Sequence, residues 1–137
     1  MSHQDVAPEH RAQIDYIDGT FQRQREAYRG QPYPPLQERL DQLGGLKEAI
    51  LSQQDRLAQA VVEDFGCRSP YESKMAEILP TVEGLTLAIQ RLKEWMAPSP
   101  RSVGLAFLPA RARVVYQPLG VVGIISPWNY PVQLALG

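Results

Sequence analysis

Apolar residues recur at helical spacing along the chain as far as Met96, and this spacing predicts amphipathic helices rather than strands there. The members of a first stripe lie three, four and seven positions apart: Ile14, Ile17, Phe21 and Tyr28. A second predicted helix begins near Leu36 and presents one apolar face: Leu36, Leu40, Leu43, Leu46 and Ile50. Gly44 and Gly45 disfavour this helix, but we expect it to continue because the stripe runs through both glycines in phase.

Two further helix starts are indicated by their capping residues. Ser52 followed by Asp55 resembles a capping box, so a separate helix is expected from there to Gly66, a residue suited to a left-handed C-terminal cap. Ser69-Pro70-Tyr71-Glu72 is the clearer start, because serine can cap, proline suits the first helical position and glutamate can bond back to the cap. Pro80 lies inside the long apolar stripe that follows, which predicts a kink or a broken turn just before it.

The pattern changes after Pro100. Residues 101–110 are expected to form a loop or linker, and the alternation over 111–116 predicts a strand. A nearly continuous apolar run follows, typical of a strand that is buried on both faces of a parallel sheet: Val121, Val122, Ile124 and Ile125. Residues 132–137 are expected to begin a helix. Because ligands collect at the carboxyl ends of strands in open α/β sheets, the loop after the apolar run is the best-placed part of the chain for a site.

Composition narrows the classes of function. Among 137 residues, 14 are basic and 15 acidic, so the net charge of −1 gives no electrostatic argument for a nucleic-acid partner. The single cysteine excludes an internal disulfide and favours a reducing compartment. With no secretory leader and no apolar run of about 18 residues, we expect a cytoplasmic protein without a membrane segment in this chain. No metal site is expected, because Glu72, Glu77 and Glu83 lack metal-ligand spacing and look like a cap and a solvated face.

Three other side chains have competing interpretations. Cys67 is expected to be an incidental surface thiol, because nothing near it in the sequence supplies an activating base. Trp95 ends an amphipathic stripe and is expected to pack. Asn129 could cap the helix after it, or its amide could donate a hydrogen bond to an oxyanion, and the local pattern favours the cap.

The run PLGVVGIISPWNYP, Pro118 to Pro131, resembles the first cofactor-domain strand and the Pro-Trp-Asn loop of the aldehyde dehydrogenase superfamily. The resemblance covers roughly Asp18 to Gly137 and is nearest to the branch that contains fatty-aldehyde and coniferyl-aldehyde dehydrogenases. It implies an α/β parent fold with a Rossmann-like cofactor domain. It also implies oxidation of an aldehyde, coniferyl or a similar aromatic or aliphatic one, to a carboxylic acid with NAD or NADP.

The same resemblance implies a division of the chain. A polar N-terminal tail is expected at 1–17, an N-terminal helical segment at 18–110 and an oligomerisation-arm strand at 111–117. The start of the NAD(P)-binding domain, truncated, is expected at 118–137. The arm implies a homodimer or a higher homo-oligomer for the full-length enzyme.

Few site residues can be carried over from the family. Asn129 matches the asparagine whose amide stabilises the oxyanion formed when a thiolate attacks the aldehyde. Four residues match the strand end that lines the NAD(P) site: Ile125, Ser126, Pro127 and Trp128. The family's nucleophilic cysteine, glutamate base and glycine-rich pyrophosphate turn belong to segments that this chain lacks.

Two expectations follow for the chain by itself. It should have no dehydrogenase activity, and it should aggregate or remain partly molten, because a single strand of a parallel sheet leaves its edges unpaired. The alternative is a non-catalytic helical interaction module or the product of a decayed gene.

Overall fold

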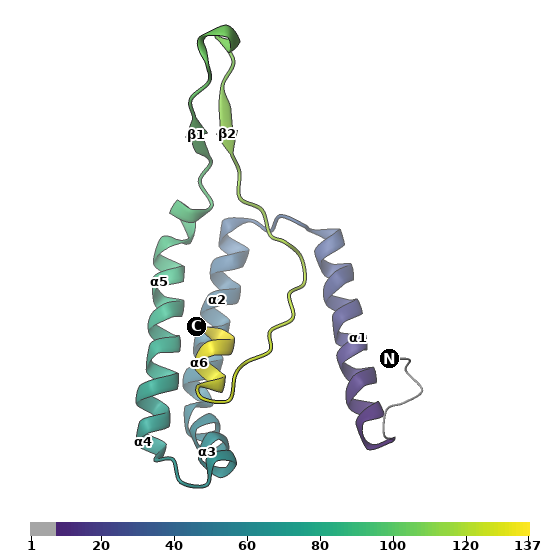
Figure 1. Ribbon diagram of the computed structural model, residues 1–137, viewed down its shortest axis with the longest axis vertical. Helices are drawn as coiled ribbons and strands as arrows, with labels where there is room; N and C mark the ends of the chain where they lie inside the picture. Colours follow the sequence, from purple (N-terminus) through teal and green to yellow (C-terminus); the bar gives the residue numbers. More distant parts are fainter. Residues whose placement is uncertain (1–7) are drawn as a thin grey trace. The chain divides into compact units, whose positions relative to one another are not determined.

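The computed structural model describes residues 8–137, which are mostly helical and carry a small two-stranded antiparallel sheet (Figure 1). The chain divides into two compact units. One comprises the chain up to Pro34 together with Pro118–Gly123, and the other comprises Pro35–Gln117 together with Ile124–Gly137. Each unit is described by itself.

The first unit is built on helix α1 (Pro8–Gly30). The helix begins inside the stretch 1–17, where the sequence suggested a polar tail, and residues 1–7 lie outside the part that the structure describes. Tyr28 donates a hydrogen bond from its hydroxyl to the carbonyl of Pro118, at 3.1 Å. Its ring lies against Gly120, whose φ of 115° is a backbone conformation that favours glycine. The predicted Pro-Leu-Gly turn is therefore held to the end of α1.

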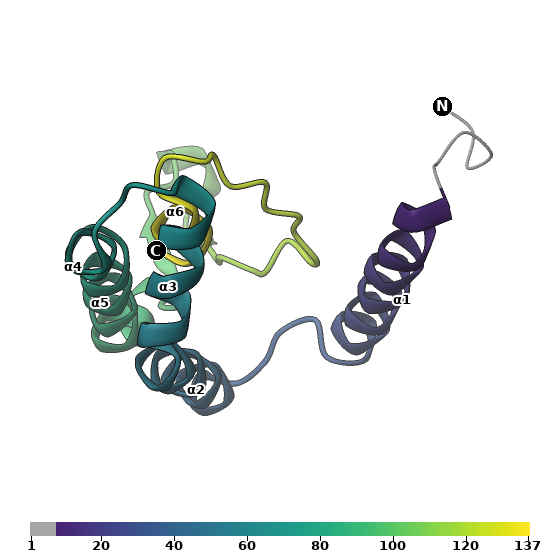
Figure 2. The same ribbon diagram turned by 90° about the horizontal axis from the view of Figure 1, so that it is seen from below.

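The second unit contains most of the helices. They are α2 (Leu36–Ser52), α3 (Gln54–Phe65), α4 (Pro70–Ser73), the π-helical η2 (Lys74–Ile78) and α5 (Leu79–Trp95). Helix α2 runs through Gly44 and Gly45 without a break, as the in-phase stripe predicted. Seen from below, α3 crosses the end of α2 while α5 lies beside it (Figure 2).

Of the three caps predicted for the helices before Pro100, the helix ends confirm two. Gly66 is left-handed, with a φ of 72°, and donates its N–H to the carbonyl of Val62. Ser69 accepts a hydrogen bond from the N–H of Tyr71 at 3.2 Å, with Pro70 in the first helical position. The capping box at Ser52 is wrong: its hydroxyl donates to Ala49 O within α2, and α3 begins after Gln53 without a side-chain cap. A serine in the last turn can satisfy its own helix instead of capping the next one.

The distortion expected before Pro80 takes the form of η2, a widened turn. Proline lacks an N–H and its ring clashes with the carbonyl four residues earlier, so an extra residue in the preceding turn relieves both problems. Thr81 then donates its hydroxyl to the carbonyl of Glu77, at 2.6 Å. The helix therefore continues through the proline instead of ending there.

The core of this unit lies where α2, η2 and α5 meet. Its buried residues are Ile50, Ile78 and Leu85, and Leu43, Leu57, Val82 and Val132 pack around them. Val132 belongs to α6 (Pro131–Leu136), the helix expected at 132–137, which contacts both η2 and α5. The end of the chain is thereby attached to the helical core.

A hairpin extends past the end of α5 in Figure 1. Strand β1 (Ser99–Arg101) pairs antiparallel with β2 (Ala112–Val114), and Ser99 lies opposite Val114. The strand expected at 111–116 is confirmed in shortened form, whereas β1 was missed. Pro100 obscured it, although proline is tolerated in an edge strand because the N–H it lacks can face away from the partner. The tip of the hairpin carries a short 3₁₀ turn, η3 (Leu105–Phe107).

The second predicted strand is wrong for this structure. Residues 121–125 form no strand among the residues described, and Ile125 is 99% exposed. A strand from the middle of a parallel sheet needs a partner on each side, and within residues 8–137 the only sheet is the β1–β2 hairpin. The apolar run therefore forms no strand here, and all of it except the partly buried Val121 is exposed.

Candidate functional site

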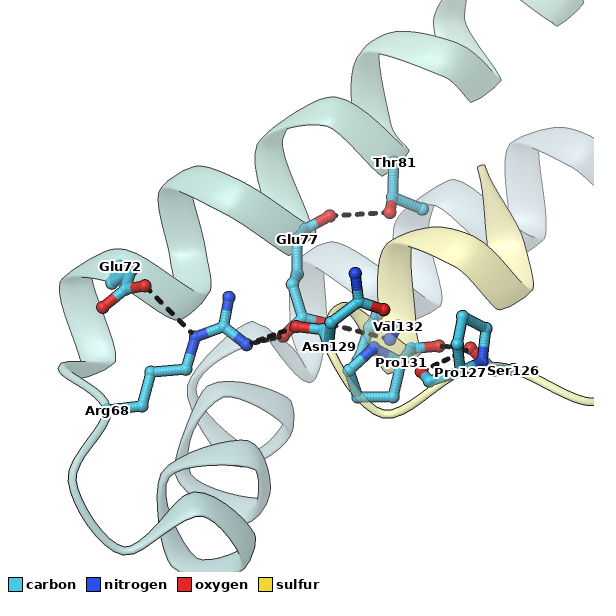
Figure 3. A network of polar contacts seen from close by, with 9 residues as sticks. All are labelled: Arg68, Glu72, Glu77, Thr81, Ser126, Pro127, Asn129, Pro131 and Val132. Atoms are coloured by element: carbon cyan, nitrogen blue, oxygen red, sulfur yellow. Dashed lines mark hydrogen bonds and ion pairs between the residues drawn. The ribbon is translucent and has the colours of Figure 1, made fainter.

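The loop between the apolar run and α6 contains Asn129 and all but one of the residues expected at the cofactor site, and Figure 3 shows Ser126, Pro127 and Asn129 within it. Ser126 donates its hydroxyl to the carbonyl of Pro131 at 2.9 Å, which closes the loop across its base. Helix α6 then begins after Tyr130, with Pro131 in its first turn and no side-chain cap from Tyr130. The loop is therefore short and internally bonded, and it opens directly into a helix.

Asn129 does not cap α6, so the interpretation that the local pattern favoured is wrong. The N–H of Val132 donates instead to Glu77 Oε2 at 2.7 Å, so a side chain from η2 supplies the cap. Asn129 takes part through its backbone, since its carbonyl accepts a hydrogen bond from Arg68 Nη1 at 3.0 Å. No hydrogen bond within residues 8–137 uses its side-chain amide, and the residue is exposed. The amide is available to an external group.

Glu77 and Arg68 form a buried ion pair beneath this loop. Arg68 Nη1 lies 3.0 Å from Glu77 Oε1, and the two side chains are only 5% and 1% exposed. The sequence suggested a solvated face for Glu77, and that interpretation is wrong. The buried side of the long helix includes Ser73, Glu77, Thr81 and Leu85 at spacings of four, whereas Met75 and Leu79 of the expected apolar stripe are exposed. Glu77 therefore faces the interior.

The guanidinium of Arg68 is also enclosed by aromatic rings. It lies 5.1 Å from the ring centre of Phe65 and 4.9 Å from that of Tyr130. Its Nε is 3.7 Å from a carboxylate oxygen of Glu72, a side chain that is 59% exposed. A buried charge is costly unless it is paired and hydrogen-bonded, so Arg68 and Glu77 depend on each other. Together they join the end of α3, the π turn and the loop.

Sequence reasoning did not find Arg68 and Glu77 as site residues. Arg68 lies between two capping signals, Gly66 and Ser69, where a single basic residue has no distinguishing pattern. For Glu77 one weak signal was present: it shares a four-residue spacing with Thr81 and Leu85, which places it on a buried helix face. The sequence alone does not show this face, because Met75 and Leu79, which fit the apolar stripe, are exposed in the structure while Glu77 is buried.

The four residues expected to line a cofactor site present a mostly apolar, open surface. Ile125 is 99% and Trp128 is 88% exposed, while the hydroxyl of Ser126 is engaged within the loop. Such a surface fits packing against a flat ring, but none of the four carries a positive charge for a phosphate. The residues present therefore fit part of a dinucleotide site. Within the described part of the chain, no group of three or more His, Cys, Asp or Glu side chains is arranged to hold a metal ion.

Cys67 is exposed and forms no disulfide. It lies at a cavity of about 290 Å³ on the outer side of the Arg68 cluster, which is lined by Phe65, Cys67, Arg68, Glu72, Asn129 and Tyr130. Trp95, expected to pack, is half exposed at 51%. No helix of residues 8–137 is both long and apolar enough to cross a membrane.

Comparison with known proteins identifies the family of the chain. Residues 2–137 match the model of the aldehyde dehydrogenase family, so the chain belongs to the aldehyde dehydrogenase family. It is 46% identical over 125 residues to a probable coniferyl aldehyde dehydrogenase of Pseudomonas aeruginosa, which covers 91% of this chain and 26% of that protein. A coniferyl aldehyde dehydrogenase of a Pseudomonas species is 35% identical over 123 residues, 90% of this chain and 25% of that protein.

A more distant relative is the aldehyde dehydrogenase family 3 member B1 of Bos taurus, 34% identical over 124 residues, 90% of this chain and 26% of that protein. The chain thus spans about a quarter of the length of the curated relatives it matches. Nearly the whole chain therefore supports family membership, whereas the activity of a whole enzyme is inferred below as a proposal.

Proposed function

We propose that this chain forms the N-terminal part of an NAD(P)-dependent aldehyde dehydrogenase that oxidises coniferyl aldehyde or a similar aromatic or aliphatic aldehyde to a carboxylic acid. The parent fold in this proposal is α/β with a Rossmann-like cofactor domain, which begins near residue 118. The observation that carries the proposal is the state of Asn129. Its backbone is bonded to Arg68 while its side-chain amide is exposed and unused, as an oxyanion donor requires.

The chemistry assigned to Asn129 is electrostatic. When a thiolate attacks an aldehyde, negative charge develops on the carbonyl oxygen. An amide N–H already aimed at that oxygen stabilises the charge without reorganising, and removing one such donor typically costs about 10²–10³ in rate. Asn129 is then a catalytic residue, and the nucleophile belongs to another part of the enzyme, because Cys67 lies in an exposed turn.

NAD or NADP, when bound, supplies the acceptor for the hydride that leaves the aldehyde carbon. In this chain Ile125, Pro127 and Trp128 would pack against the dinucleotide, and Ser126 would keep the loop closed behind them. Their exposed apolar surface also excludes water from the contact once it is covered. The β1–β2 hairpin is proposed as the arm that pairs with a second copy, since no other strand within residues 8–137 pairs with either of its outer edges. The proposed compartment is the cytoplasm.

The experiment is a chimera in which this chain replaces the matching quarter of the Pseudomonas aeruginosa relative. The chimera is assayed for NAD(P)-dependent oxidation of coniferyl aldehyde, with the intact relative as reference and the isolated 137-residue chain as the negative sample. The proposal expects an active chimera and an inactive isolated chain. A folded, oligomeric chimera without activity would contradict it and favour a non-catalytic helical interaction module or a decayed gene product. Turnover by the purified chain alone would contradict the expectation that the nucleophile belongs to another part of the enzyme.

A further inference from the structure

The backbone of Asn129 is hydrogen-bonded to the rest of the unit, whereas its side-chain amide is exposed. Its carbonyl accepts a hydrogen bond from Arg68, and helix α6, which starts two residues later at Pro131, is capped by Glu77 at the N–H of Val132. The two anchoring side chains come from the α3–α4 connection and from η2, and they form an ion pair with each other. Both ends of the loop segment 129–132 are thus attached to one buried ion pair (Figure 3).

We infer that Arg68 and Glu77 are positioning residues that aim the Asn129 amide at the reacting oxygen. This inference rests on the proposed function, since it needs Asn129 to act on the aldehyde. Both side chains are almost wholly buried beneath the loop, and Arg68 also forms part of the wall of the cavity at Asn129. Their effect passes through the backbone of residues 129–132. A displacement of about 1 Å in a catalytic group can cost roughly 10²-fold in rate, so the anchor matters although it lies outside the reaction.

The chemistry of the anchor requires a carboxylate at position 77. Glu77 uses Oε1 toward Arg68 and Oε2 toward the N–H of Val132, so both oxygens face donors. A glutamine of the same shape has one acceptor oxygen, and its NH₂ group would face either Arg68 or Val132, each of which also donates. Glu77→Gln is therefore an isosteric change that must break one of the two attachments. Arg68→Lys keeps a positive charge near Glu77 but loses the planar group that also reaches the Asn129 carbonyl.

The test uses the chimera and its steady-state kcat for aldehyde oxidation per active site, together with its KM for the aldehyde. Glu77→Gln is expected to lower this rate roughly 10- to 100-fold with little change in KM, because the lost geometry serves the transition state. Glu72→Gln is the matched control. Glu72 is the same residue type, three-fifths exposed and 3.7 Å from the same arginine, and its replacement should stay within about twofold.

A double-mutant cycle distinguishes a positioning effect that acts through Asn129 from an effect of the ion pair on the stability of the fold. If Glu77 acts through Asn129, Glu77→Gln should cause less than about a threefold further loss in an Asn129→Ala background. The same large factor in both backgrounds would overturn the inference and assign the ion pair a structural role only. Arg68→Lys is carried through the same cycle, so the inference remains testable where Glu77→Gln yields no folded protein.

The outcomes also separate the inference from the proposed function. Full activity of the Asn129→Ala chimera would refute the proposed role of Asn129, and the positioning role with it. A large loss with Asn129→Ala but none with Glu77→Gln or Arg68→Lys would refute the positioning role alone.

Discussion

The N-terminal cap of α6 can be tested at a single amide. Glu77 Oε2 accepts the hydrogen bond of the Val132 N–H at 2.7 Å, and the carboxylate is 1% exposed. A hydrogen bond to a charged group contributes about 1.5–3 kcal/mol. Since about 1.4 kcal/mol corresponds to a factor of ten, Glu77→Ala should accelerate hydrogen exchange at Val132 roughly 10- to 150-fold.

The assay is single-amide hydrogen exchange on the chimera, in which the chain has the rest of an enzyme to pack against. The amide of Met96, bonded to Leu92 at the far end of α5, serves as the internal reference and should change much less. Glu72→Ala serves as the matched variant, because Glu72 approaches Arg68 only at 3.7 Å and from solvent. Unchanged exchange at Val132 in Glu77→Ala, or equal acceleration at Val132 and Met96, would refute the view that Glu77 caps α6 locally.

Three further predictions concern folding and association. Leu85→Ala should lower the free energy of unfolding by about 2–5 kcal/mol, because Leu85 is 5% exposed in the core, whereas Leu87→Ala, 51% exposed, should change it little; equal urea midpoints for the two would contradict this packing. Gly120→Ala should lower the local stability of the turn by about 1–3 kcal/mol because of the φ of 115° at this position, whereas Gly123→Ala, in open space, should not. Hydrogen exchange at the end of α1 is the measurement, and slower exchange in Gly120→Ala than in Gly123→Ala would contradict the prediction. The isolated chain should self-associate through its exposed apolar run, and Ile125→Lys should raise the monomer fraction in sedimentation velocity; a wild-type chain that stays monomeric would contradict this.

The helices could be predicted because their signals are local. Gly66 and Ser69 form the caps that their residue types favour, and the stripe of α2 continues through its two glycines. Pro80 predicted a distortion because the loss of an N–H has the same consequence in any helix. In each case the cause lies within a few residues of the effect.

The predictions that are wrong concern features that depend on contacts with residues far away in the sequence. The run 121–125 has the composition of a buried strand, but a strand forms only beside another strand. The cap of α6 comes from Glu77, 55 positions away from Val132, so the local preference for Asn129 was overridden. Glu77 is buried within the π turn, where its partner Arg68 comes from another part of the chain. The family motif located the loop correctly, and only the structure showed what holds it.

We propose that the exposed amide of Asn129 serves the reaction of an aldehyde dehydrogenase. The most direct measurement is the kcat of the Asn129→Ala chimera for NAD(P)-dependent oxidation of coniferyl aldehyde, relative to the unmodified chimera at equal active-site concentration. A loss of about 10²–10³ in kcat, with the oligomer and the fold intact, is the predicted result. A kcat within about threefold of the unmodified chimera would contradict the claim, because a single oxyanion donor cannot be removed at so small a cost.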